Sequence, residues 1–452
     1  MTSIRTFKVS TRALATLSSS EKKILPILID AAKAIDKIFQ KQENPVNNGA
    51  NFYPRDATKT EIAEEAQKNS KIFSPFTIVK RNQKGKLIAV DYHVEYKNDL
   101  APIAKLLKKA AGISENATFK NYLIAVADAL VHGNYSQADK AWTGTKKNNL
   151  DIEIGPYERY LDKLFFIKRA YQASVCIVDH EKSEKASTIR DIIYASVSPN
   201  SHRIISPTTT NIEVRESFIF SGFLGRALFT QQHLPSDSDS VERYGSRILG
   251  YLSSLNYKFD KIIYPIFCAV FEKSFRERYT KDLIKKGCYY RVLLSGIVQH
   301  LHRYRNSRTR LKELFPIFDE ANVAASGIEH AKHLVLKGVM DQKELEAMMI
   351  AQICWGFSEF VIARKNSTRD VYLKGDAMIF NFLIREGALL EKDGISWPNF
   401  AKMFFEMENL SSIFTRILEE GNYMDAQEFL AKYLSLETLK AFESRLLEIK
   451  PI

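Results

Sequence analysis

The feature that most constrains the fold is a change of pattern at Pro235–Ser240, which reads Pro-Ser-Asp-Ser-Asp-Ser. Short polar side chains in such a run cannot pack into a core, so the segment predicts a boundary. Before it, alternating and helical patterns are mixed, whereas from Tyr244 to Leu447 apolar residues recur almost wholly at helical spacing. We therefore predict an α+β protein of two lobes, with a mixed α/β lobe at residues 1–240 and a predominantly helical lobe at residues 241–452.

Several segments of the first lobe have a distinct period. Ser10–Lys41 places Ile24, Leu28, Ala31 and Ile35 at three- and four-residue steps, which predicts a helix. Phe73–Tyr96 alternates apolar and polar residues around Asn82–Gly85, which predicts a β-hairpin. Further strands are expected at Leu150–Ile154, Ala173–Val178, Ile192–Ser196 and Arg203–Ser206.

Composition narrows the class of protein. The formal net charge of +12 fits a negatively charged partner, such as nucleic acid, an anionic membrane or an acidic protein, without choosing among them. No run reaches the roughly 18–20 apolar residues of a membrane span, and the N-terminus lacks the apolar stretch of a secretory signal. The four cysteines have no C-x-x-C spacing, which argues against a disulfide framework and favours a reducing compartment, the cytoplasm.

Three segments together resemble the dipeptidyl peptidase III family. They are Asn51–Lys59 followed by Ser74–Thr77, then Ile154–Phe165 with its Gly-Pro-Tyr-Glu, and finally Gly375–Ala388. Their order and spacing match the family over most of the chain. The resemblance implies a two-lobed zinc exopeptidase, with substrate peptide held as an added strand in a cleft between the lobes.

The resemblance also implies a metal helix with H-E-x-x-G-H, or the shorter H-E-x-x-H, in the second lobe. Arg291–Leu301 fits this helix by its apolar stripe. Here Ser295 stands in for the first histidine, and Gly296 for the glutamate that acts as general base. The second histidine is replaced by Gln299 on the short alignment or retained as His300 on the long one, and both alignments remain open.

Two further positions of the family can be matched in the second lobe. Glu320, in Asp319–Ala324, keeps the zinc-ligating glutamate, and Tyr372 replaces a histidine that helps the transition state. Catalytic zinc needs about three protein ligands and an open position for water. At most His300 and Glu320 survive as ligands, and Gly296 cannot accept a proton. We therefore expect no cofactor, with bound zinc as the less favoured alternative.

The substrate side of the family's site is better kept. Glu158 and Tyr160 match positions that, by resemblance, bind the free amino terminus and backbone of the peptide. A competing interpretation is that this segment serves folding alone. The leading hypothesis is a catalytically inactive protein that binds a peptide or protein partner in or near the former active-site cleft.

Two alternatives remain open. The first is a metal-dependent hydrolase with a rearranged site around Glu320, His300 and His302. The second is an anion or nucleic-acid binder that uses the basic run after the metal helix, and nucleic acid is the less favoured partner. The candidate anion-binding residues are Arg303, Arg305, Arg308 and Arg310.

Overall fold

The computed structural model describes residues 3–196, 210–235, 238–301, 304, 306–364, 369–390 and 398–451; for His300 it describes the backbone. The chain forms two compact units, one made of residues 1–183 and 209–254 and the other of the remaining residues. The first contains a sheet and helices, and every described regular element of the second is a helix. The prediction of a two-lobed α+β protein is therefore confirmed.

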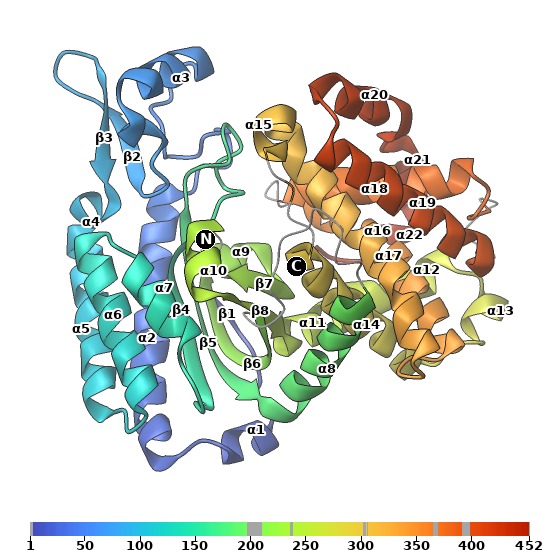
Figure 1. The fold of residues 1–452 in the computed structure, drawn as a ribbon, viewed down its shortest axis with the longest axis horizontal. Coiled ribbons are helices and arrows are strands. Elements are labelled where there is room, and N and C mark those ends of the chain that lie inside the picture. The colour runs from blue at the N-terminus through green and yellow to red at the C-terminus, as the bar shows by residue number, and fades with distance from the viewer. Residues whose placement is uncertain are drawn as a thin grey trace. The chain divides into compact units, whose positions relative to one another are not determined.

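The first unit is built on a six-stranded sheet in the order β4-β5-β6-β8-β7, with β1 added beside β6 (Figure 1). The pairing of β6 with β8 is parallel, and the other pairings are antiparallel. The strands are β1 (Arg5–Thr6), β4 (Leu150–Glu158), β5 (Ala170–Asp179), β6 (Thr210–Gly222), β7 (Gln231–Leu234) and β8 (Ser246–Tyr251).

The first unit also contains helices, several of which pack against this sheet, and a small two-stranded hairpin that forms a separate sheet. The helices are α1 (Thr11–Ala15), α2 (Ser19–Gln42), α3 (Lys59–Lys68), α4 (Tyr92–Glu95), α5 (Lys97–Ile113), α6 (Ala117–His132), α7 (Ser136–Thr143), α9 (Phe223–Ala227) and α10 (Ser238–Tyr244), with a 3-10 turn at Ser70–Phe73. The hairpin consists of β2 (Thr77–Arg81) and β3 (Leu87–Asp91). Helix α2 packs against β4, β5 and β6, α5 packs against α2, and α6 packs against α5 (Figure 1).

The sequence explains α2 and the hairpin. Ser18 and Glu21 form a reciprocal capping box at the start of α2, and the predicted stripe from Ile24 to Ile35 is buried. In the hairpin, the side chain of Asn82 accepts hydrogen bonds from the backbone of Lys84 and Lys86, and Gly85 has a φ of 76°. The helix and the hairpin are confirmed, but the predicted range Ser10–Lys41 is divided into α1 and α2, and the end of the range Phe73–Tyr96 is the helix α4.

One predicted strand and part of one predicted helical range are wrong, and a second predicted strand is not described. Ile192–Ser196 is not a strand but the last part of α8 (His180–Ser196), in which Ile189 and Ile193 are buried at a spacing of one helical turn. The strand expected at Arg203–Ser206 lies outside the described residues. The helical prediction from Tyr244 onward is wrong at β8, where the consecutive residues Ile248 and Leu249 are both buried, so the strand has no alternation to recognise. The sheet therefore continues beyond residue 240.

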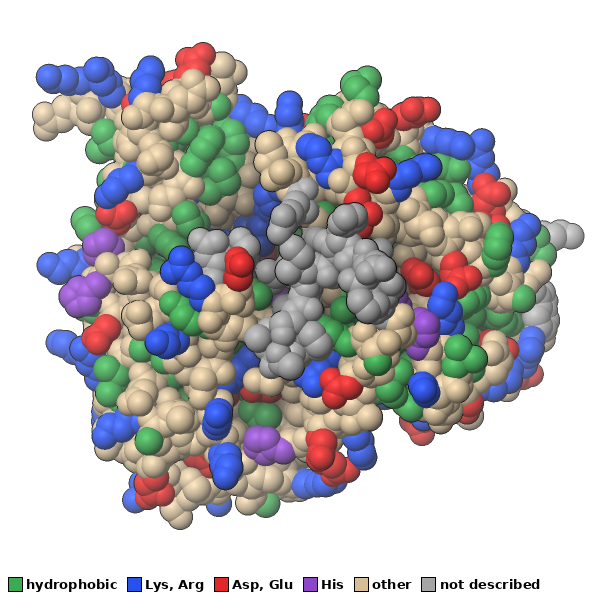
Figure 2. All heavy atoms as spheres, viewed as in Figure 1, with side chains coloured by type: hydrophobic (Ala, Val, Ile, Leu, Met, Phe, Trp, Pro, Cys, Tyr) green, Lys and Arg blue, Asp and Glu red, His purple; other side chains and the backbone are tan. Residues whose placement is uncertain are grey.

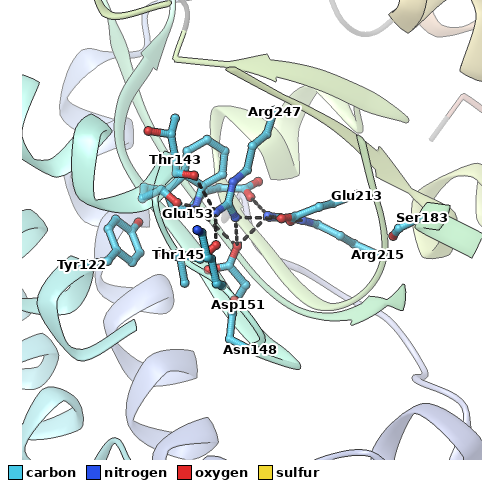
Figure 3. A network of polar contacts seen from close by, with 12 residues as sticks. Tyr122, Thr143, Thr145, Asn148, Asp151, Glu153, Ser183, Glu213, Arg215 and Arg247 are labelled. Carbon is cyan, nitrogen blue, oxygen red and sulfur yellow. Dashed lines mark hydrogen bonds and ion pairs between the residues drawn. The ribbon is translucent and has the colours of Figure 1, made fainter. Parts of the chain in front are cut away.

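A buried ionic network ties three strands of the sheet together (Figure 3). The guanidinium of Arg215 on β6 donates to Glu153 at 2.7 Å and to Asp151 at 2.5 Å, both on β4, and also pairs with Glu213. Arg247 on β8 pairs with Glu213 at 2.8 Å. Both arginines are almost completely excluded from solvent. Because a buried charge is stable only when it is paired, the network fixes the register of β4, β6 and β8.

The second unit is a packed group of long helices. Its elements are a π-helical turn at Phe259–Ile263, α12 (Tyr264–Val270), α13 (Lys273–Arg276), α14 (Lys281–Leu301), α15 (Ser307–Leu311), a 3-10 turn at Lys312–Leu314, α16 (Phe315–Leu336), α17 (Gln342–Ala363), α18 (Asp370–Arg385), α19 (Phe400–Glu419), α20 (Tyr423–Tyr433), α21 (Glu437–Lys440) and α22 (Glu443–Leu446). Helix α11 (Leu252–Lys258) leads into it from the sheet. Helix α16 packs against α14, α17, α18 and α19 and so forms its centre (Figure 1).

Helix α17 has the length and the apolar composition of a membrane span. Among the described residues, α17 alone is long and apolar enough to cross a bilayer by length and composition, but 94% of its most apolar window is buried within the protein. Core helices of globular units share these properties. The helix is accounted for by packing against α14 and α18.

Candidate functional site

The helix that resembles the metal helix of the family is α14. Its predicted apolar stripe, which includes Leu294 and Ile297, is buried. Ser295 is only 5% exposed and lies against Gly327 of α16. A Cβ atom added to Gly327 would stand 3.4 Å from the backbone nitrogen of Ser295 and 3.7 Å from its Oγ atom. The hydroxyl of Ser295 is therefore part of a close contact between two helices.

The neighbouring positions of α14 offer little metal chemistry. Gly296 is buried and has no side chain, and Gln299 is half-buried and carries an amide. The backbone of His300 belongs to α14, but its side chain lies outside the described part of the chain, as does the whole of His302. Zinc prefers imidazole, thiolate and carboxylate ligands, so a hydroxyl, a glycine and an amide are a poor donor set.

Glu320 lies on α16, about two turns or roughly 10 Å of helix rise before Gly327. Two cations act on it. Burial lowers the pKa of Arg291, and the negative charges of Asp376, Glu359 and Glu320 oppose that effect. Burial alone would also lower the pKa of Arg369, but the carboxylate of Glu359, with smaller contributions that include Glu320, raises it above its ordinary value. The negative charge of Glu320 thus contributes, less than the other carboxylates named, to the electrostatic environment of Arg291 on α14 and of Arg369, the residue that precedes α18.

Tyr372 stands one turn into α18, and its ring lies 4.0 Å from the Cζ atom of Arg369. One turn further, Gly375 touches α16, because a Cβ atom placed there would be 3.4 Å from the backbone nitrogen of Ala321. Ala321 directly follows Glu320. The structure therefore brings the helix of Tyr372 to the part of α16 that carries Glu320.

A set of buried ionic contacts in this unit was missed by the sequence analysis. The carboxylate of Glu359 on α17 accepts from Lys258 at 2.8 Å and from Arg369 at 2.7 and 2.6 Å. Burial would raise the pKa of Glu359, but Arg369 and Lys258 lower it to about 2. Burial lowers the pKa of Lys258 to about 8. The available signal was a single carboxylate inside the apolar stretch Ile353–Ala363, since a buried carboxylate requires a cationic partner.

Within the described ranges, no group of three or more histidine, cysteine, aspartate or glutamate side chains is arranged to hold a metal ion. The four cysteines are free thiols.

The substrate-side residues lie at the end of β4 in the first unit. The Oε1 atom of Glu158 accepts from the backbone nitrogens of Arg159 at 2.8 Å and Tyr160 at 3.1 Å. The ring of Tyr160 packs edge-on against Phe166, with centroids 6.3 Å apart. Both Glu158 and Tyr160 are half-buried. Glu158 therefore stabilises the turn after the strand and keeps part of its surface accessible.

Two of the three segments that carry the family resemblance meet around Asp162. This buried carboxylate accepts from the backbone nitrogens of Leu164, Phe165, Ile167 and Lys168, and from the hydroxyl of Tyr53 at 3.1 Å. The amine of Lys168 donates to the carbonyls of Ile72 and Ser74 and to the Thr77 hydroxyl, at 2.7 to 2.9 Å. The Asn51–Lys59, Ser74–Thr77 and Ile154–Phe165 segments thus fold together, and this shared packing fixes the position of Glu158 and Tyr160.

The basic run after α14 is only partly described, because Arg303 and Arg305 fall outside the described residues. Arg308 places its guanidinium 4.7 Å from the ring of Phe315. Arg310 donates to the carbonyls of Leu418 at 2.6 Å and Glu419 at 2.8 Å, and to that of Gly421, at the end of α19. Arg310 therefore caps a helix C-terminus. On the face seen in Figure 2, lysine and arginine side chains are scattered among acidic ones rather than gathered in one block.

The fold is shared with solved structures. The structure of dipeptidyl-peptidase III from Corallococcus sp. strain EGB superposes with a TM-score of 0.84 at 21% sequence identity, over 99% of this chain and 94% of that one. The structure of DPP III from Caldithrix abyssi gives a TM-score of 0.82 at 24% identity, over 99% and 96% of the two chains. This chain therefore has the dipeptidyl-peptidase III fold, as the three segments indicated.

Sequence comparison adds one curated protein. Nudix hydrolase 3 of Arabidopsis thaliana is 24% identical over 469 residues, which is 94% of this chain but 59% of that protein. The chain thus spans about three fifths of the length of the curated relative it matches. No protein-family model matches the chain.

Proposed function

We propose that this protein is a catalytically inactive member of the dipeptidyl-peptidase III fold that binds a peptide or a protein segment at the surface carrying Glu158 and Tyr160. The shared fold supports a peptidase-like scaffold, and the residues of α14 and α16 support the absence of catalysis. We infer no activity for this protein from the name of the longer Nudix relative. Free cysteines without disulfide bonds suit a reducing compartment, and we propose the cytoplasm.

The observation that carries the proposal is the contact between Ser295 and Gly327. The position matched to the first zinc-binding histidine holds a hydroxyl that is buried against a neighbouring helix. The next residue, Gly296, has no side-chain group that could accept a proton from water. The described residues at these positions do not fit a catalytic zinc ion. Loss of a general base alone typically lowers a rate by about 10²–10⁴-fold.

Binding is tested with a fluorescent oligopeptide that has a free amino terminus, by anisotropy on the full chain. We expect saturable binding that weakens about tenfold when the peptide is N-acetylated or when Glu158 is changed to Gln, because each change removes one charge of a pair. Glu64→Gln, an exposed carboxylate on α3, is the matched control and leaves affinity unchanged. Equal affinity for the free and acetylated peptides would overturn the assignment of Glu158.

The two alternative functions predict other results. A metal-dependent hydrolase built on Glu320, His300 and His302 would release product in the presence of zinc and lose this activity in Glu320→Ala. An anion or nucleic-acid binder would bind a duplex with a steep salt dependence, of slope about −0.9 per phosphate contact. In our account, zinc produces no turnover and peptide binding depends on Glu158 rather than on Arg308.

A further inference from the structure

The outer surfaces of two neighbouring helices of the first unit, α2 and α5, are basic. Helix α2 carries five lysines and α5 carries four, against three acidic residues on α2 and one on α5. Of these acidic residues, Asp36 is buried, and Glu21 completes the capping box at the start of α2. Asp30 and Asp99 are therefore the acidic residues of the two helices that remain to offset the lysine charge at the surface.

Most of these lysines have no ion pair. Lys41 pairs with Asp99, and Lys108 pairs with Asp128 of α6 at 2.8 Å. The other lysines of the two helices are exposed and form no ion pair within the described part of the chain. We call six of them the lysine face: Lys22, Lys23, Lys33 and Lys37 of α2, and Lys105 and Lys109 of α5.

Helical spacing sets the arrangement of these side chains within each helix. Lys33 and Lys37 are four residues apart, as are Lys105 and Lys109, so each pair lies on one side of its helix, separated by about 6 Å of helix rise. Like charges at this spacing destabilise a helix slightly. The stability of α2 and α5 therefore does not account for these lysines.

Helices α2 and α5 pack against each other in antiparallel directions (Figure 1). Lys41, near the end of α2, pairs with Asp99 in the first turn of α5. At the other end, the hydroxyl of Ser20 donates to Glu115, two residues beyond α5, at 3.3 Å. Because the axes of packed helices lie about 8–10 Å apart, the lysines of the two helices form one basic surface.

The chemistry of the lysine face fits the backbone of a nucleic-acid duplex. A duplex carries one negative charge per about 1.7 Å of its axis, which a group of ammonium ions can neutralise. Lysine is a point charge without the planar fork of arginine, and contacts to phosphate carry no sequence information. Within the described residues, the large apolar side chains that are exposed lie on neither α2 nor α5. The face therefore has no side chain to stack on the bases of a single strand or to enter a lipid bilayer.

We infer that the lysine face binds the phosphate backbone of double-helical nucleic acid without selecting a sequence. This activity goes beyond the proposed peptide binding and does not depend on it, because Glu158 and Tyr160 lie outside the face. It also differs in location from the anion-binding alternative, which uses the basic run after α14.

Fluorescence anisotropy of a labelled DNA duplex, titrated with the full chain at several salt concentrations, tests this inference. The variant replaces Lys33, Lys37, Lys105 and Lys109 by glutamine, which removes charge from exposed positions. For wild type, we expect the logarithm of the binding constant to fall linearly with that of the salt concentration, with a slope of about −0.9 per phosphate contact. The variant should lower the magnitude of this slope by about 2–4 and weaken binding at low salt by about tenfold or more.

A matched control separates the lysine face from net charge. Lys84 and Lys86 of the hairpin and Lys261 and Lys337 of the second, helical unit are also exposed, with no ion pair among the described residues. Changing these four to glutamine removes the same charge and should leave affinity for the duplex within about twofold of wild type. Equal weakening in the two variants contradicts the inference, since binding would then follow net charge alone.

Other probes decide the class of partner. Phosphatidylserine vesicles, polyglutamate and a single strand of the same length should each bind more weakly than the duplex at equal salt concentration. Tighter binding of any of these probes overturns the assignment to a duplex. If Arg308→Ala lowers the salt slope and the lysine-face variant does not, the basic run after α14 binds the nucleic acid and the inference fails.

Peptide binding distinguishes the failure of this inference from that of the proposed function. The lysine-face variant should keep wild-type affinity for the oligopeptide with a free amino terminus. If the duplex does not bind while this peptide does, the inference alone fails. If the duplex binds through the lysine face while Glu158→Gln leaves peptide affinity unchanged, the inference stands and the assignment of Glu158 fails.

Discussion

Ser295 and Gly327 meet at a contact between α14 and α16, where a Cβ atom on residue 327 would lie 3.7 Å from the Ser295 hydroxyl. A metal helix must direct its ligands into space that an ion and a water molecule can enter. Here the corresponding side chain is small and is covered by the neighbouring helix. The contact with α16 therefore leaves little free space around the side chain of Ser295.

Restoring a histidine at this position should be unfavourable. We expect Ser295→His to destabilise the helical unit by about 1–3 kcal/mol, because an imidazole overfills the contact with α16. Urea unfolding followed by alkylation of Cys354 measures this free energy. Gly327→Ala is the control and should be neutral or slightly stabilising, since its Cβ makes ordinary van der Waals contacts. A Ser295→His variant as stable as wild type would contradict this packing.

The buried network of the sheet predicts a pH dependence. Burial raises the pKa of Glu153 from the ordinary 4.5 to about 7, against the opposing effects of Arg215 and Tyr251. Between these pH values the folded state holds a proton that the unfolded state has released, so the contribution of Glu153 to stability falls as pH rises from 4.5 to 7. The total effect is at most about 3 kcal/mol. Glu153→Gln should remove this part of the slope.

Alkylation of Cys176, which is buried in the same unit, measures this slope when the rate is normalised to the unfolded chain at each pH. Glu216→Gln, on β6 outside the network, is the matched control and should keep the wild-type slope. The assignment fails if Glu153→Gln and wild type lose stability in parallel over this pH range.

The capping role of Arg310 gives a prediction for the basic run. Arg310→Ala should destabilise the helical unit by about 1–3 kcal/mol, because the carbonyls at the end of α19 lose a charged donor. Arg308→Ala removes a cation–π contact and should cost about 0.5–1 kcal/mol from that contact. Urea unfolding compares the two variants. If both instead weaken binding to an RNA duplex equally and leave stability unchanged, the run is an anion-binding surface.

The fold was predictable where local pattern and tertiary packing agree. The apolar stripe of α2 and the turn at Asn82–Gly85 are each determined by local residues. The three motif segments indicated the dipeptidyl-peptidase III fold, which the solved structures share. Strand β8 was not predictable, because burial on both faces removes the alternation that marks a strand. The end of α8 was misread because the run Ile192–Tyr194, rich in β-branched residues, hides a helical repeat.

The buried contacts of Glu359 with Lys258 and Arg369 could not be predicted from the sequence, for a different reason. Lys258, Glu359 and Arg369 come from separate elements, and nothing in their spacing indicates that they meet. The lone carboxylate in α17 indicated that a partner must exist but not which one. The sequence predicts which positions of the family's site are replaced, and that stays a prediction, whereas the contacts of Glu359 with Lys258 and Arg369 are known only from the structure.

The central claim is tested most directly by measuring zinc content and dipeptide release on the same preparation of the full chain. The protein is purified with zinc in the buffer, freed of excess metal, analysed by inductively coupled plasma mass spectrometry, and incubated with an unlabelled oligopeptide. We predict zinc far below one equivalent and no dipeptide release above the blank. Near-stoichiometric zinc, together with release that 1,10-phenanthroline abolishes, would contradict the account.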